Sequence, residues 1–172
     1  MRAILIDWLV EVHLKFKLVP ETLYLTVSLI DRFLEKETIM RERLQLVGVT
    51  AMLIASKVEE IYAPEVQDFV YITDRAYQRE EILDAERKML VKLDFQTSHF
   101  SSYGFLQRYA SLVDSDPFIL NMARYLLELS LVEYKMLKHH PSMLASASLY
   151  LAQKIVRKPN AWPEQLQAES GF

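Results

Sequence analysis

The chain contains no cysteine, and only three glycines and six prolines occur in its 172 residues. Without cysteine it can form no disulfide and no zinc–thiolate site, and it has no cysteine nucleophile, which suits an intracellular protein. So few glycines and prolines leave little turn chemistry for a β-sheet protein. The composition therefore favours an all-α fold.

A long apolar run and an excess of basic charge are missing as well. The longest apolar stretch, residues 46–55, is interrupted by Gly48 and falls far short of the ~20 residues that span a bilayer. Arg2, Asp7 and Glu11 are scattered through the first helix, unlike the charged-then-apolar order of a signal segment. The formal net charge of −3 gives no electrostatic footprint for nucleic acid. We expect protein partners, with no nucleic acid and no membrane.

Motifs for catalysis or metal binding are equally scarce. Glu59 and Glu60 are adjacent, but no partnered nucleophile, Gly-rich phosphate loop or metal-ligand spacing accompanies them, so we interpret them as solvated charges at a helix end. His139 and His140 are also adjacent, so their side chains diverge on a helix. Without nearby carboxylates or cysteines we interpret them as surface or cap residues instead of metal ligands. We predict no enzyme activity, no cofactor and no metal.

Helical spacing is what the chain does have, and it is most unusual in the opening segment, residues 1–13. Apolar side chains point from this helix in nearly every direction. They form two stripes on roughly opposite sides, one of Met1, Leu5, Trp8 and Val12 and the other of Ala3, Ile6, Val10 and Leu14. We expect one stripe to face a core and the other a partner.

Four more helices are predicted before residue 95. The first of these begins near Pro20, and the other three cover residues 41–60, 65–71 and 78–93. The helix over 41–60 has an apolar face of small residues, as expected of a central helix. Five helices in about 95 residues make one domain of ordinary size.

A second domain is predicted after a polar linker at residues 94–102. Shifted by 97 positions, the pattern begins again, although so few matches among leucine- and alanine-rich helices leave a true duplication open. The matched pairs are Leu23 and Leu120, Ile30 and Leu127, Asp31 and Glu128, Leu34 and Leu131, Ala55 and Ala152, and Lys57 and Lys154. We therefore expect domains at residues 1–96 and 97–172. Helices near 118–136 and 142–156 would form a partial second bundle, and the tail after Pro159 has no room for two more helices.

Several motifs in order carry a family resemblance: Met1–Leu9, Glu21–Tyr24, Asp31–Leu34, Leu44–Gly48, Ala55–Tyr62, Pro64–Val66 and Phe69–Asp74. The sequence closely resembles the cyclin box of mitotic A- and B-type cyclins. The resemblance is dense over residues 1–95 and looser over 97–156. It implies a five-helix cyclin box followed by a partial second cyclin-type bundle.

The resemblance also implies a function. Such a chain is a non-catalytic subunit that binds a cyclin-dependent kinase as a heterodimer and activates it at G2/M and mitosis, in nucleus and cytoplasm. A kinase needs its strand lysine paired with a glutamate on a mobile helix, and a rigid helical partner can select that paired state.

Two residues match the family's kinase contacts, Lys57 and Glu86. In cyclins the corresponding lysine and glutamate contact the backbone near the start of the kinase's mobile helix, which suits an ammonium donor and a carboxylate acceptor. At random helical positions both would simply be solvated. The motif context favours the kinase contact.

A second set matches the hydrophobic patch that holds basic-hydrophobic motifs of substrates and inhibitors. Spacings of three and four residues make it one strip on the first helix, and helical spacing alone would favour a buried core strip. Its residues are Met1, Ile4, Leu5, Trp8 and Glu11, with Gln45 from the third helix. Glu11 offers an acceptor for a peptide arginine.

Arg2 and Asp31 resemble a buried ion pair that links the first two helices of the family. If the charges are buried they must be paired, because removing one partner of such a pair costs about 3–5 kcal/mol. We assign this pair to structure.

The chain departs from the family in several ways. It begins at the cyclin-box motif, its linker at residues 95–102 lacks the prolines that the family usually carries, and its second box is short. These departures fit a fragment, a divergent product or an incomplete gene model. A different class also fits the fold: a cyclin-fold binding module of the general transcription factor type. Salt-dependent DNA binding would distinguish that class.

Overall fold

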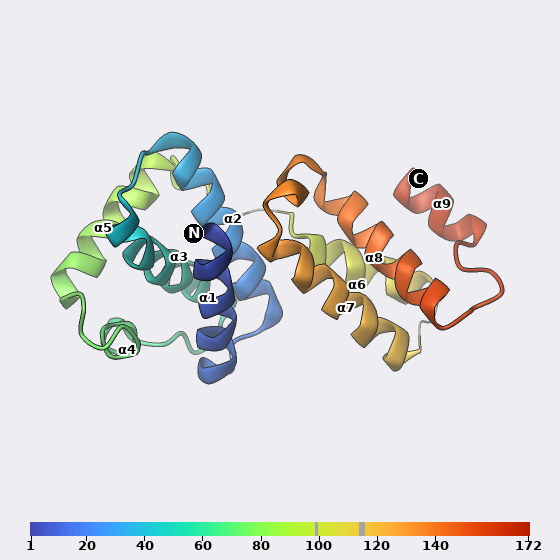
Figure 1. The fold of residues 1–172 in the computed structure, drawn as a ribbon, viewed down its shortest axis with the longest axis horizontal. Coiled ribbons are helices and arrows are strands. Elements are labelled where there is room, and N and C mark those ends of the chain that lie inside the picture. Colours follow the sequence, from blue (N-terminus) through green and yellow to red (C-terminus); the bar gives the residue numbers. More distant parts are fainter. Residues whose placement is uncertain (99, 114–115) are drawn as a thin grey trace. The chain divides into compact units, whose positions relative to one another are not determined.

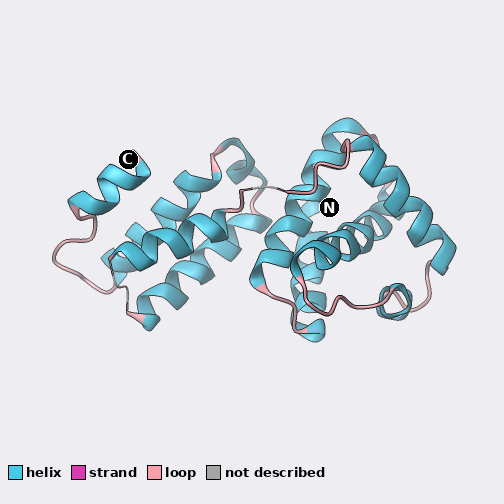
Figure 2. Cartoon of the chain, turned by 180° about the vertical axis from the view of Figure 1, so that it is seen from behind, coloured by secondary structure: helices cyan, strands magenta, loops and turns pink. Residues whose placement is uncertain are grey.

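The computed structural model describes residues 1–98, 100–113 and 116–172. These residues form nine α-helices and two short 3₁₀ helices, with no strand among them (Figures 1 and 2). The all-α prediction is confirmed. The chain divides into two compact units, residues 1–99 and 100–172. The predicted linker includes His99, which lies outside the described residues.

The first unit contains the five predicted α-helices. They are α1 (Arg2–Phe16), α2 (Pro20–Lys36), α3 (Leu44–Glu59), α4 (Val66–Ile72) and α5 (Arg79–Lys92), with the 3₁₀ helix η1 (Arg41–Arg43) directly before α3. Their ends follow local chemistry: Pro20 opens α2, and Glu65 and Gln78 begin the capping boxes of α4 and α5. Lys17 ends α1 in a left-handed conformation.

Helix α3 is the centre of the first unit. Every residue from Leu46 to Ser56 is buried, because α3 packs against α1, α2, α4 and α5. Gly48 permits the approach of α1, since a methyl group added there would lie 2.8 Å from Leu5 Cδ1 and 3.3 Å from Leu9 Cδ1. The small-residue face of α3 therefore lets α1 pack closely against this central helix.

The buried face of α1 does not follow the two predicted stripes. Each stripe is divided: Leu5 and Ile6 are buried, whereas Met1, Ala3 and Leu14 are exposed. The reason is that α1 packs against both α2 and α3, which produces one broad buried face instead of two narrow ones. A strip of apolar residues remains exposed along the edge of that face.

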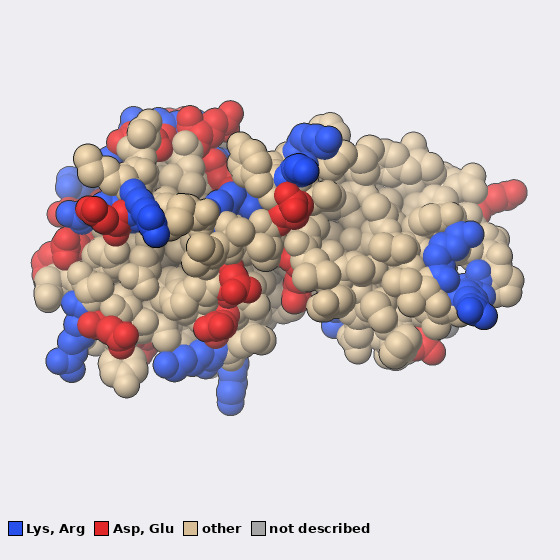
Figure 3. Space-filling model, in the orientation of Figure 1, with Lys and Arg blue, Asp and Glu red and all other residues tan. Residues whose placement is uncertain are grey.

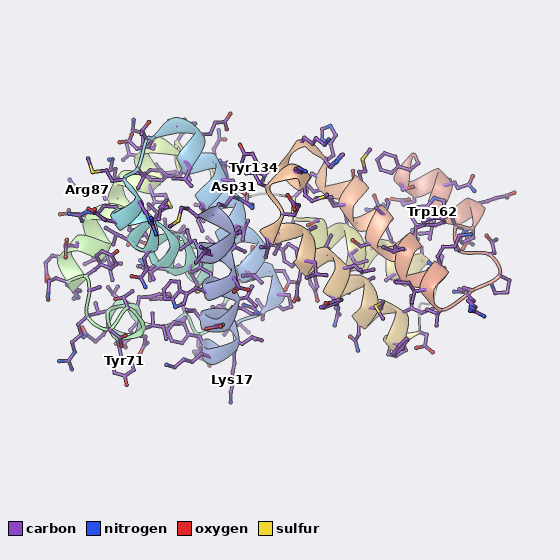
Figure 4. All side chains as sticks on the ribbon, in the orientation of Figure 1. Lys17, Asp31, Tyr71, Arg87, Tyr134 and Trp162 are labelled. Atoms are coloured by element: carbon purple, nitrogen blue, oxygen red, sulfur yellow. The ribbon has the colours of Figure 1, made fainter. Side chains whose placement is uncertain are left out.

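The second unit contains α6 (Ser102–Leu112), α7 (Pro117–Val132), the 3₁₀ helix η2 (Tyr134–Lys138), α8 (Pro141–Ile155) and α9 (Glu164–Ser170). Both α6 and α7 pack against α8. The tail holds one short helix, α9, that sequence analysis missed. Leu166 of α9 is fully buried. Trp162, labelled in Figure 4, lies edge-on to Tyr150 of α8 with ring centroids 6.1 Å apart.

Candidate functional site

The last turn of α3 carries Lys57, whose partner comes from α5. Lys57 Nζ donates to both carboxylate oxygens of Glu86, at 2.6 and 2.9 Å. The packing of α3 against α5 brings these two residues together across 29 positions of sequence. About half of the lysine side chain is exposed, while most of the glutamate is covered. The pair thus presents a charged donor and a charged acceptor, already oriented, at the protein surface.

An exposed apolar segment that sequence analysis missed follows Lys57 directly in the sequence. Val58 is half exposed at the end of α3, and Ile61 and Tyr62 in the following loop are 90% and 92% exposed. Large apolar residues at such exposure are typical of a binding site. Their position in the sequence could have indicated this exposure, because Ile61 and Tyr62 lie in the loop between the end of α3 and Pro64. We call Lys57, Val58, Ile61, Tyr62 and Glu86 the α3-end surface.

Glu60 is not the solvated charge that the sequence suggested. Its Oε1 accepts a hydrogen bond from the backbone N–H of Val19 at 2.8 Å and another from the hydroxyl of Thr22 at 2.6 Å. The carboxylate therefore caps the start of α2 from 38 to 41 positions away. Glu59 next to it is exposed. Partial burial, together with the charges of Glu21 and Glu60, raises the pKa of Glu59.

The predicted docking strip lies along α1, with one member from α3. Met1, Ile4 and Glu11 are exposed, and Trp8 and Gln45 are partly exposed. Leu5 is only 7% exposed and belongs to the core, so it can form only the floor of such a strip. Met1, Ile4, Trp8 and Glu11 recur at spacings of three and four residues, which places them on one side of α1.

Arg2 and Asp31 join the first turn of α1 to α2 (Asp31 is labelled in Figure 4). Arg2 Nε donates to Asp31 Oδ1 at 2.6 Å, and its Nη2 donates to Oδ2 at 2.8 Å. The two side chains are 13% and 19% exposed. Two parallel bonds between largely covered groups fix the position of α1 on α2 and so hold the docking strip in place.

The charges on one face of the molecule are distributed differently over the two units. On the face shown in Figure 3, acidic and basic side chains alternate over the first unit, whereas the second unit carries few charges. Within the described part of the chain, no group of three or more His, Cys, Asp or Glu residues could hold a metal ion. No helix there is both long and apolar enough to cross a membrane.

Comparison with known proteins gives consistent matches for both units. Residues 1–98 match the model "Cyclin, N-terminal domain", and residues 100–172 match "Cyclin, C-terminal domain". The whole chain is 49% identical to Cyclin-B2-1 of Oryza sativa subsp. japonica and 48% identical to G2/mitotic-specific cyclin-B of Hydra viridissima, covering 41% and 44% of those proteins. The chain thus spans about two fifths of the length of these relatives.

Solved structures show the same fold. A viral cyclin from herpesvirus saimiri superimposes with a TM-score of 0.88 at 21% identity, covering 99% of this chain and 77% of that one. A chain of the CAK complex from Chaetomium thermophilum superimposes with a TM-score of 0.65 at 19% identity, covering 99% and 57% respectively.

Proposed function

The chain belongs to the cyclin family, and we propose that it is a regulatory subunit that binds and activates a cyclin-dependent Ser/Thr protein kinase at G2/M. Members of this family are regulatory subunits without catalytic activity of their own. The relatives named as G2/mitotic-specific cyclins support the phase of the cell cycle. Such a subunit would act in the nucleus and cytoplasm.

The α3-end surface is the observation that carries this proposal. Lys57 uses two hydrogen bonds on Glu86, so its ammonium group has one N–H left for a carbonyl oxygen of a partner. The Glu86 carboxylate has further lone pairs for backbone N–H groups, which are unpaired at the start of a helix. Exposed Ile61 and Tyr62 supply the apolar contact area beside this polar pair.

Activation follows from docking a rigid body on a mobile kinase helix. The kinase is active when the glutamate of that helix pairs with the strand lysine that holds the ATP phosphates. A partner that binds this arrangement more tightly than the open one shifts the population toward it and contributes no catalytic group. The closed core around α3 gives the chain the rigidity that this role requires.

The docking strip on α1 would recruit substrates and inhibitors to the same complex. Its exposed apolar residues and Glu11 fit a short peptide that has a basic residue near one or two apolar residues. The Arg2–Asp31 pair has a structural role in this proposal, because it holds α1 against α2.

The experiment is co-purification with a cyclin-dependent kinase, followed by an assay of histone phosphorylation. The double variant Lys57→Ala plus Glu86→Ala should lose both binding and activation while its circular dichroism stays helical. The matched control is Arg108→Ala plus Glu169→Ala, which removes an ion pair between α6 and α9 of the second unit and leaves the residues of the α3-end surface and the cap of α5 unchanged. That control should bind as the natural chain does.

Two results would contradict the proposal. If both double variants bind the kinase equally well, the α3-end surface is not the contact. If the natural chain is folded but binds DNA in a salt-dependent manner and binds no kinase, the transcription-factor class is correct instead.

A further inference from the structure

The last turn of α3 is held from two sides by charged contacts. On one side Lys57 donates to Glu86 of α5, and on the other Glu60 accepts from the start of α2. Only two residues separate these anchors in the sequence. The end of α3 is thus fixed between its two neighbours.

Glu60 supplies a cap that α2 lacks in its own sequence. The N-cap residue is Val19, whose side chain cannot accept a hydrogen bond, and Pro20 follows it. The carboxylate of Glu60 accepts from the Val19 amide and also carries negative charge at the positive end of α2. Thr22 is fully buried, so its hydroxyl depends on the same oxygen for a partner.

The segment that follows Glu60 has little else to orient it. Ile61 and Tyr62 are almost fully exposed, so core packing does not fix their direction. The segment is anchored again at Glu65, whose backbone N–H donates to Asp68 at 2.8 Å in the capping box of α4. Its two ends are therefore held by carboxylates, and Glu60 is the anchor on the side of α3.

We propose that Glu60 is a positioning residue for kinase binding, which sets the direction in which Ile61 and Tyr62 leave α3 by holding that helix against the first turn of α2. This inference rests on the proposed function of the α3-end surface. Glu60 acts through its hydrogen bonds to Val19 and Thr22, and it needs no contact with the kinase. Its removal releases the loop while the Lys57–Glu86 pair remains.

The test compares the kinase affinity of four variants of this 172-residue chain with that of the natural chain, at a temperature where circular dichroism shows all of them folded. Glu60→Ala removes both hydrogen bonds and should weaken binding about tenfold, the loss expected if roughly one molecule in ten keeps the loop in its binding direction. Glu60→Gln should recover most of the affinity, because its amide oxygen can accept from both donors. In Glu60→Ala the amide of Val19 should also exchange its hydrogen faster than in the natural chain.

Two control variants test whether a loss of affinity in Glu60→Ala could come from the loss of a negative charge in this region or from lower folding stability. Glu59→Ala removes an adjacent exposed carboxylate and leaves the bonds of Glu60 to Val19 and Thr22 in place, so affinity should stay within about twofold of the natural chain. Tyr77→Phe removes a partly buried hydrogen bond to the carbonyl of Glu42 at 3.0 Å, so it lowers stability away from the α3-end surface and should not change affinity.

The outcomes are distinct. If Glu60→Ala binds as tightly as Tyr77→Phe, or if Val19 exchange is unchanged, Glu60 does not position the surface and the inference is wrong while the proposed function stands. If Glu60→Gln binds as poorly as Glu60→Ala, the carboxylate charge matters directly and the inference is again overturned. If the natural chain binds no kinase, the proposed function fails and the inference fails with it.

Discussion

Helices α3 and α8 are the central helices of the two units, but they are covered to different extents. In α3 the residues from Leu46 to Ser56 are all buried, whereas α8 leaves Tyr150, Leu151 and Ile155 exposed. The cause is the number of neighbours: α3 packs against four α-helices of its unit, while α8 packs against α6, α7 and α9. One unit has a closed core, and the other has an apolar face in solvent.

The comparison can be made residue by residue, because a shift of 97 positions places α3 on α8. Ala55 and Ala152 are both fully buried, so the inward faces match. The preceding positions differ: Ile54 of α3 is 3% exposed, whereas Leu151 of α8 is 47% exposed. Large aliphatic residues at corresponding positions are therefore buried in one unit and exposed in the other. The neighbouring helices determine which of them belong to a core.

The largest expected effect comes from placing a charge at the two positions that differ most. Ile54→Lys puts an unpaired ammonium into a closed core and should cost more than about 4 kcal/mol, enough to unfold the first unit. Leu151→Lys should change stability by less than about 0.5 kcal/mol. Urea denaturation can follow each unit separately, because the chain's two tryptophans are divided between them, Trp8 in the first and Trp162 in the second. Equal losses in both variants would show that α8 is as well covered as α3.

A smaller effect is expected at Asp31 and its counterpart Glu128. Asp31→Ala removes the bidentate partner of Arg2 and should cost about 2 kcal/mol, below the 3–5 kcal/mol of a fully buried pair. Glu128 is exposed, so Glu128→Ala should stay within about 0.5 kcal/mol. The same tryptophan-resolved denaturation measures both. A loss at Glu128 equal to that at Asp31 would mean that the two units use this position alike.

The third prediction concerns Gly48 and its counterpart in α8, the fully buried Ala145. A larger side chain at Gly48 meets Leu5 and Leu9, so Gly48→Leu should cost about 1–3 kcal/mol through overpacking. Gly48→Ala is the control. Its methyl group meets Cδ1 of both Leu5 and Leu9, but a gain of about 0.5–1 kcal/mol in helix propensity opposes this strain, so Gly48→Ala should cost less than Gly48→Leu. A stable Gly48→Leu variant would show that α1 can move away from α3.

Much of the fold could be predicted from the sequence, because helical spacing and capping residues are local signals. The starts of α2 and α7 follow from Pro20 and Pro117. Helix α9 could not be predicted, because the burial of Leu166 depends on tertiary packing against α6 and α8. The same limit explains Glu60, whose partners are about 40 positions away. The assignments of Lys57, Glu86 and the docking strip stay predictions, because they concern contacts with other molecules.

The smallest expected effect is a difference in acid response between the units. Hydrogen bonds from Lys88 and then Lys92 lower the pKa of Glu37 in the first unit to about 2. In the second unit Glu128 is exposed as a residue, but neighbouring atoms partly desolvate its carboxyl and raise its pKa, an effect that Arg124 opposes. A carboxyl with a lowered pKa contributes stability above its ordinary value near 4.5, and that contribution is lost as pH falls toward 2. A carboxyl with a raised pKa has the opposite sign, because protonation on acidification relieves its cost.

Denaturation at several pH values between 6 and about 2.5 can measure this difference. Glu37→Gln should make the stability of the first unit less dependent on pH in that window, since the amide cannot titrate. Glu128→Gln should remove a small gain that the second unit makes on acidification. If Glu37→Gln leaves the pH dependence of the first unit unchanged, the two lysines do not hold the carboxylate in solution. The acid response would then come from elsewhere, and the charged contacts between α2 and α5 would contribute nothing to the difference between the two units.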